Sequence, residues 1–242
     1  MTESNDNELQ ATELEDEKVS ASYGFSISPR FLVISLSVTA LALLFCHAAL
    51  TVYHYQVSEV SWLPWRQLFD VDEENNLPTW FSEFLLLITV VLLWLCSDKK
   101  RRDKDPSVDH WYTLTIGFLL LAMDEIAGFH ETINSLVDPT WAIGGGLLAL
   151  GVGVGFIPFL RRLPKRTAIL FVVAGAIYVG GTVGVEIIGE PLDSDTMAYN
   201  LLTVLEEGME MFGVIFFVPV LLGYMRESDA GPLRGVVELT SH

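Results

Sequence analysis

The chain has 242 residues, of which 51% are apolar, and its charged residues fall in short clusters between long apolar segments. The formal net charge of −17 excludes a nucleic-acid-binding protein, because binding to phosphates requires a basic surface. This composition is typical of an integral membrane protein.

The first segment, residues 1–29, carries seven acidic residues before position 18. It lacks the basic region and the short apolar region of a cleavable signal peptide. We therefore predict a disordered acidic cytoplasmic tail at residues 1–29, and a second, short cytoplasmic tail at residues 227–242.

Between these tails lie six apolar segments, each close to the ~20 residues that a helix needs to span a bilayer. The sequence predicts an all-α membrane protein, a bundle of six transmembrane helices over residues 30–226. The predicted spans are Phe31–Val52, Trp80–Ser97, Trp111–His130, Trp141–Leu160, Thr167–Ile188 and Tyr199–Met225.

The orientation follows from two loops that hold most of the Lys and Arg residues, one after the second span and one after the fourth. Basic loops stay on the cytoplasmic side, so both termini are predicted to be cytoplasmic. The bases are Lys99, Lys100, Arg101, Arg102 and Lys104 in the first loop, and Arg161, Arg162, Lys165 and Arg166 in the second.

The longest loop on the other side, Tyr53–Thr79, mixes aromatic residues with acids. Its Trp residues suit a segment that lies at the membrane surface, and its acids read as solvated loop charges. These acids are Asp70, Asp72, Glu73 and Glu74. In spans four and five, small residues at helical spacing predict close helix packing at Gly151/Gly155 and at Ala176/Gly180/Gly184.

Acidic residues inside four of the spans are predicted to share one layer near the outer surface. A carboxylate at the bilayer centre costs about 2.5–3.5 kcal/mol, and the sequence has no Lys or Arg from Trp111 to Leu160 or from Thr167 to Met225. Protons, metal cations or water must therefore neutralise these acids.

Carboxylates combined with imidazoles are a suitable ligand set for Fe, Mn or Zn, and we predict a divalent metal centre here. The predicted ligands are Asp124, Glu125, His130, Glu131, Glu206, Glu207 and Glu210, with Glu83, Glu186, His47 and His54 as a possible second shell. The spacing differs from the Glu-x-x-His motif of four-helix di-iron proteins. Haem bound by the His residues would leave the acids unexplained, and the spans have no Lys for a retinal Schiff base.

At these residues the chain resembles an uncharacterised family of six-span bacterial inner-membrane proteins. The family pattern is roughly L-D-E-x4-H-E in one helix and L-E-E-x2-E in a later one, matched here at Asp124–Glu131 and Leu205–Glu210. The resemblance covers spans two to six and includes the stretch Glu74–Ser82 before Glu83. Some members are described as multidrug transporters, and the resemblance implies a multi-pass protein of the bacterial inner membrane.

Three functions remain open at this point. The first is a metal-dependent membrane enzyme that activates water or oxygen at the outer face. The second is a proton- or cation-coupled transporter that uses the same acids, and the third is a non-catalytic membrane partner. The apolar inner halves of spans two to six favour a site open to one side, whereas neither a substrate nor an oligomeric state follows from the sequence.

Overall fold

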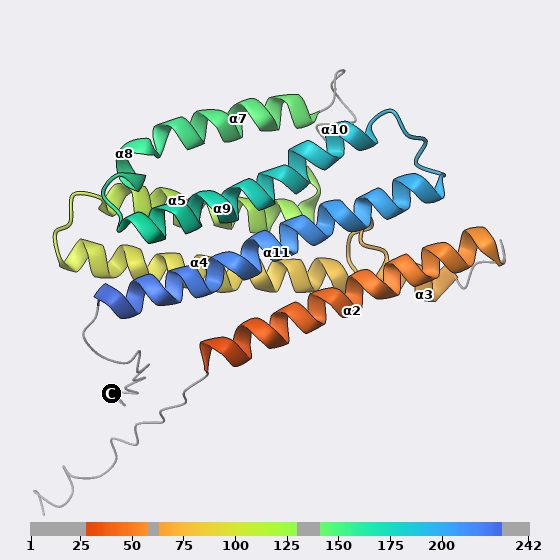
Figure 1. Cartoon of the computed structure of the whole chain (residues 1–242), viewed down its shortest axis with the longest axis horizontal. Helices are drawn as coiled ribbons and strands as arrows, with labels where there is room; N and C mark the ends of the chain where they lie inside the picture. Colours follow the sequence, from red (N-terminus) through yellow and green to blue (C-terminus); the bar gives the residue numbers. More distant parts are fainter. Residues whose placement is uncertain (1–27, 58–62, 130–140, 229–242) are drawn as a thin grey trace, which may run out of the picture.

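The computed structural model describes residues 28–57, 63–129 and 141–228. Throughout these ranges the regular structure is helical, and the helices lie roughly side by side along one axis (Figure 1). Four described segments are long and apolar enough to cross a membrane, so by length and composition this is a multi-pass membrane protein. They are α2 (Pro29–Gln56), α4 (Leu77–Arg102), the continuous run from α9 (Lys165–Val179) through η1 (Gly180–Val185) to α10 (Glu186–Gly189), and α11 (Met197–Ser228).

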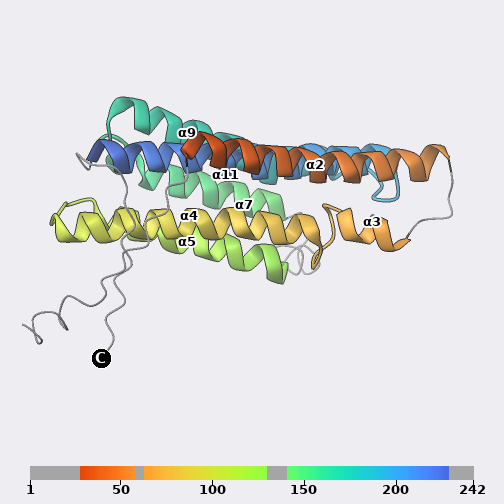
Figure 2. The same cartoon turned by 90° about the horizontal axis from the view of Figure 1, so that it is seen from below.

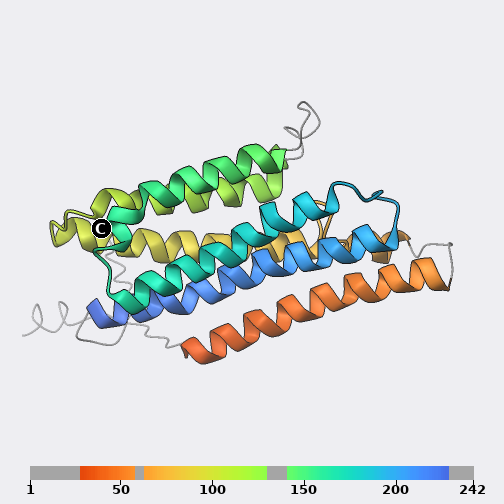
Figure 3. The same ribbon diagram turned by 45° about the horizontal axis from the view of Figure 1, so that its top comes forward.

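The predicted third and fourth spans correspond to α5 (Val108–Ala127) and α7 (Trp141–Gly155), which is followed by α8 (Ile157–Leu160). Both α5 and α7 run alongside the longer helices (Figure 3). With 15 residues, however, α7 is shorter than the ~20 that span a bilayer, and α5 is polar at both ends. The structure thus supports four spans, and the six-span bundle stays a prediction.

The start of α4 is fixed by Asn76, which follows the short helix α3 (Leu63–Phe69). The Asn76 side chain accepts a hydrogen bond from the Thr79 N–H at 3.2 Å, which caps the helix. Its amide group donates to the carbonyl oxygens of Asp70 and Glu73, and Pro78 occupies the first turn. The loop of residues 70–76 is therefore folded against the beginning of α4.

The two glycines Gly181 and Gly213 let the run from α9 to α10 pack directly on α11. A Cβ at Gly181 would lie 2.8 Å from the Glu206 carbonyl oxygen, and one at Gly213 would lie 2.9 Å from the Tyr178 backbone nitrogen. Six residues of π-helix, η1, follow immediately after Tyr178 and Val179, and such π segments are frequent at functional sites. This packing sets the position of Tyr178 beside α11.

The glycine prediction for close packing is wrong at most of its positions. A Cβ would meet nothing within 4 Å at Gly151, Gly155 or Gly184. Gly180 does make a close contact, 2.9 Å from the Met209 methyl group. In η1 the close contacts with α11 are thus made at Gly180 and the neighbouring Gly181, and not at Gly184.

Figure 2 shows the two ends of the helix bundle. We call the end with the basic loops of residues 98–109 and 161–166 the basic end, and the opposite end, with α3 and the start of α11, the acidic end. At the basic end, the Arg162 side chain donates to the Pro106 carbonyl at 3.3 Å, so the two basic loops lie together. At the acidic end, Arg66 donates to the Asn200 side chain at 3.2 Å, which joins α3 to the start of α11. This separation agrees with the predicted orientation, which itself stays a prediction.

The basic half of the molecule is filled by a core that is rich in aromatic rings, which we call the aromatic core. The Trp111 ring stacks on Tyr224 with centroids 5.0 Å apart and meets Phe159 edge-on at 5.2 Å. Phe171 meets Phe217 edge-on at 4.7 Å. A second, more aliphatic core joins α2, α4 and α11 farther along.

Candidate functional site

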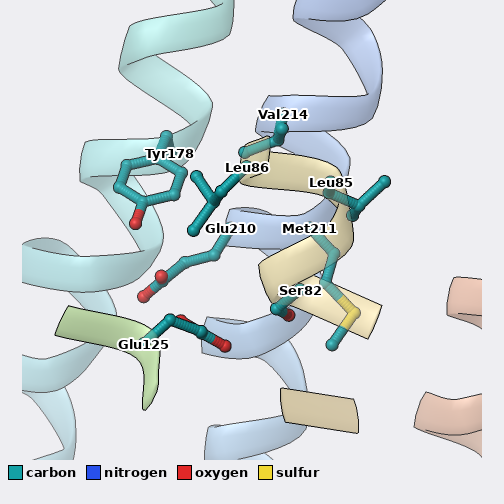
Figure 4. A pocket seen from close by; sticks show the side chains of 8 residues that line it. All are labelled: Ser82, Leu85, Leu86, Glu125, Tyr178, Glu210, Met211 and Val214. Atoms are coloured by element: carbon teal, nitrogen blue, oxygen red, sulfur yellow. The ribbon is translucent and has the colours of Figure 1, made fainter. Parts of the chain in front are cut away.

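Side chains from four helices line a small cavity of about 10 Å³ between α4, α5, α9 and α11. Its polar lining consists of Ser82, Glu125, Tyr178 and Glu210, which Figure 4 shows pointing toward one another. The remaining lining is apolar: Leu85, Leu86, Met211 and Val214. A volume of about 10–15 Å³ is enough for one water molecule. The cavity therefore suits a water molecule or a small ion among oxygen atoms.

Tyr178 connects α9 to the acids of α11. Its side chain lines the cavity beside that of Glu210, and the charges of Glu210, Glu125 and Glu207 all act on its hydroxyl group. The sequence analysis did not identify Tyr178. The available signal was a single tyrosine in the otherwise apolar stretch LFVVAGAIYVGG. At about 100° per residue, this tyrosine lies about 60° around the helix from Gly181.

The four glutamates Glu125, Glu206, Glu207 and Glu210 form what we call the carboxyl cluster. The charges that act on Glu207 come from Glu210, Glu125, Glu206 and, from the loop at the acidic end, Asp72. The structure thus brings together four of the residues that the sequence predicted as ligands. It adds Tyr178, Ser82 and Asp72 to them.

Lys and Arg are absent from most of the described helices around the carboxyl cluster. The described parts of α5, α7, η1, α10 and α11 contain no Lys or Arg before Arg226, at the far end of α11. Arg66 at the acidic end lies instead 3.7 Å from Asp70 and donates to Asn200. That protons, metal cations or water neutralise these acids stays a prediction.

A second acid of the same loop, Glu74, covers the end of α5. Helix α5 stops at Gly128, which has the left-handed φ of 53° and donates its N–H to the Asp124 carbonyl at 2.8 Å. The Glu74 carboxyl group fills the space where a Cβ of residue 128 would stand. Acids of the loop 70–76 therefore reach both α5 and the neighbourhood of Glu207.

His47 forms a separate polar site with Asp70. The Val71 N–H lies 3.1 Å from His47 Nδ1, and Asp70 Oδ1 lies 3.2 Å from the same nitrogen. One nitrogen cannot serve both partners at once: Nδ1 without a proton accepts from the Val71 N–H, and Nδ1 with a proton donates to Asp70. Both side chains are buried, with 2% and 10% of their surface exposed.

Asp70 corrects the prediction that the acids of this loop are simply solvated. Burial alone would raise its pKa. The hydrogen bond and charge of His47, the Asp72 N–H and the charge of Arg66 outweigh burial and hold the pKa of Asp70 below its ordinary value. Nearby polar and charged groups thus favour the ionised form of Asp70, a loop acid that the sequence alone presents as exposed.

The remaining predicted residues lie apart or outside the described ranges. Glu83 is buried in α4, and its Oε2 has no hydrogen-bond partner among the described residues. The His54 ring meets Tyr55 edge-on at 4.9 Å, Asp124 lies in the last turn of α5, and Glu186 begins α10. His130 and Glu131 lie outside the described residues.

The predicted metal centre is not supported by the described part of the chain. There, no group of three or more His, Cys, Asp and Glu side chains is arranged to hold a metal ion. One physical reason is that Glu206 and Glu207 point about 100° apart on α11, so their carboxyl groups diverge.

Comparison with known proteins gives a family for the chain but no activity. Neither the curated proteins nor the solved structures include one that matches it. A family model, a domain of unknown function (DUF8692), matches residues 30–223, which include every helix that contributes to the carboxyl cluster and nearly all of the described helices. The chain therefore belongs to the DUF8692 family.

Proposed function

We propose that this protein is a proton-coupled transporter of a small cation, and that the carboxyl cluster binds the proton and the cation in turn. The observation that carries the proposal is the cavity itself. There Tyr178, Glu210, Glu125 and Ser82 form the polar lining, and the space is about 10 Å³. This is a cation-sized space lined by four oxygen-bearing side chains and four apolar ones.

Protonation is the simplest way to keep such a cluster in a membrane. Several carboxylates close together do not all remain ionised, because each charge disfavours the next, and neighbouring acids share protons as one coupled unit. Ionisable residues within membrane spans commonly mark ion pathways and proton relays. A cation that occupies the cavity would remove the need for a proton, which links the two binding events.

The cluster is connected to the acidic end of the molecule. Asp72 acts on Glu207, and Glu74 lies against the end of α5 beside Gly128. Toward the basic end the aromatic core closes the bundle, with Trp111 and Phe159 fully buried. A transport cycle therefore requires a second conformation in which the packing around these two rings opens.

A metal-dependent membrane enzyme is the alternative proposal. It would use Fe, Mn or Zn at Asp124, Glu125, Glu206, Glu207 and Glu210, together with His130 and Glu131. In this alternative, the His130 imidazole and the Glu131 carboxylate would join the acids of the cluster. They would complete a metal ligand set that the described acids do not form alone. Metal content separates this alternative from proton coupling.

The test uses purified protein in proteoliposomes that hold a pH gradient and a pH-sensitive dye. Addition of Na⁺, K⁺ or Mg²⁺ should dissipate the gradient for at least one cation, and Glu210→Gln and Glu207→Gln should abolish the response. Glu190→Gln is the matched control, because Glu190 is an exposed acid at the acidic end. If the wild type responds to none of the three cations, or the Gln variants respond like wild type, the proposal is wrong.

Elemental analysis of the same preparation addresses the alternative. We expect no stoichiometric Fe, Mn or Zn after dialysis against a chelator. One tightly held metal ion per chain that is lost in Glu207→Gln would replace the transporter proposal by the enzyme proposal.

A further inference from the structure

The two basic loops at the basic end differ in how their charges are balanced. The loop around residues 98–109 has five bases and four acids, and four of the bases pair within the loop. Lys100 lies 3.0 Å from Asp105, and Arg101 lies 2.7 Å from Asp98. Lys99 pairs with Asp103 at 3.5 Å, and Arg102 with Asp98 at 3.0 Å. This loop is close to neutral as a unit.

The other loop, residues 161–166, contains four bases and no acid. All four side chains are exposed, and Arg162 donates to the Pro106 carbonyl. Arg161, Lys165 and Arg166 have no ion-pair partner within the ranges that the structure describes. A concentrated positive charge is therefore left at one place on the basic end.

The position of these bases makes the charge less favourable still. Lys165 and Arg166 form the first turn of α9, and this turn contains no acidic residue. The helix dipole disfavours cations at a helix N-terminus and favours anions there, by about 0.3–1 kcal/mol each. An anionic partner at this loop would balance both the side chains and the dipole.

We propose that the acidic segment of residues 1–17 of the same chain binds the loop 161–166. This segment has seven acids and no base, and it joins the described structure at α2. Helix α2 begins in the half of the molecule toward the basic end, where α9 begins and α11 ends (Figure 1). The charges are complementary, and the neutralised loop 98–109 offers no comparable site.

The linker between the two sites is long enough. Residues 18–28 separate the acidic segment from α2, and a chain of this length spans at most about 36 Å. Tethering of this kind gives an effective concentration of order mM, so weak ion pairs suffice. The contact should be sensitive to salt, because charges at the surface are screened over about 8 Å at 0.15 M ionic strength.

The experiment measures the distance between a spin label at Ser4→Cys and one at Glu227→Cys, at the exposed end of α11. It uses the full chain with Cys46 and Cys96 replaced by Ala, in nanodiscs of phosphatidylcholine. We expect a short-distance population in wild type at low salt that is lost in Arg161→Gln/Lys165→Gln/Arg166→Gln and at 0.5 M NaCl. The matched control, Lys99→Gln/Arg101→Gln, alters bases that are already paired and should leave that population unchanged.

Two further measurements keep the proposal falsifiable if the triple variant does not fold. In a chain whose seven acids are replaced by Gln or Asn, the short-distance population should also disappear. In nanodiscs with 30% phosphatidylglycerol it should decrease, because anionic headgroups compete for the same bases. A distance distribution that none of these changes affects would overturn the proposal. So would loss of the population in the control variant, since the loop 161–166 would then not be the site.

Discussion

Gly181 in η1 lies against the backbone of Glu206 in α11, so closely that a Cβ at position 181 would stand 2.8 Å from the Glu206 carbonyl oxygen and 3.0 Å from the Met209 Cβ. The contact sets the spacing between Tyr178 and the carboxyl cluster. We expect Gly181→Ala to push η1 away from α11 and to lower the free energy of unfolding by about 1–3 kcal/mol, the usual cost of an overpacked contact. Thermal unfolding in detergent measures this change.

Gly184→Ala in the same π-helix is the control for that substitution. A Cβ at position 184 would meet nothing within 4 Å. Alanine costs less conformational entropy than glycine, so we expect a stability that is equal to wild type or higher by about 0.5–1 kcal/mol. Equal losses in both variants would show that the contact between Gly181 and Glu206 has no special role.

Tyr178→Phe removes the hydroxyl group beside Glu210 in the cavity lining and leaves the ring in place. A hydrogen bond to a charged group contributes about 1.5–3 kcal/mol, which corresponds to roughly a 10- to 100-fold change in a rate or an affinity. We expect cation-driven dissipation of the pH gradient to slow by this factor. Tyr53→Phe, at an exposed tyrosine of α2, should transport at the wild-type rate, and a wild-type rate in Tyr178→Phe would remove this residue from the site.

Asp70→Asn breaks the buried pair with His47 and leaves its ring without the anionic partner. Removing one partner of a buried pair typically costs about 3–5 kcal/mol, and we expect the lower part of this range. Because the pKa of Asp70 is lowered in the folded protein, this contribution is present above the ordinary value of 3.8 and is lost as the pH falls through the folded pKa. Unfolding by chemical denaturant at pH 7 and at pH 3 measures both effects; a variant as stable as wild type at pH 7 would contradict the prediction.

Asp105 at the basic end gives a second acid-dependent prediction. Burial would raise its pKa, but the Ser107 hydroxyl and N–H groups and Lys100 lower it from 3.8 to about 2. The carboxylate therefore stabilises the turn above pH 3.8, and this contribution is lost between about pH 4 and pH 2. We expect Asp105→Asn to be less sensitive to pH in this window. The loss of stability in Asp105→Asn should be smaller than in Asp70→Asn, since Asp105 is more exposed and solvent screens its charge. Unfolding measured between pH 4 and pH 2 tests this, and identical pH profiles for wild type and variant would refute the prediction.

Much of the fold follows from local sequence. Long apolar runs predicted the helices, and Asn76 and Pro78 mark the start of α4 within three residues of the predicted start at Trp80. The segregation of basic loops to one end is confirmed by the contact between Arg162 and Pro106. The fourth span is less well supported, because the glycine-rich helix α7 ends at Gly155 after only 15 residues.

Only part of the candidate site could be predicted. Glu125 and Glu210 were identified because charge in an apolar segment is conspicuous at the level of sequence. Tyr178 was not, because its role depends on the close approach of α9 to α11 at Gly213, which no local pattern encodes. The pairing of His47 with Asp70 was missed for a similar reason, since it joins residues 23 positions apart across a loop.

The most direct test of the central claim is infrared difference spectroscopy of the reconstituted protein during a pH titration, which follows the carbonyl stretch of protonated carboxyl groups. We predict a protonated carboxyl signal in wild type that decreases when the transported cation is added at constant pH, and that is absent from the Glu207→Gln/Glu210→Gln double variant. A signal that the double variant retains, or that no cation changes, would contradict the account.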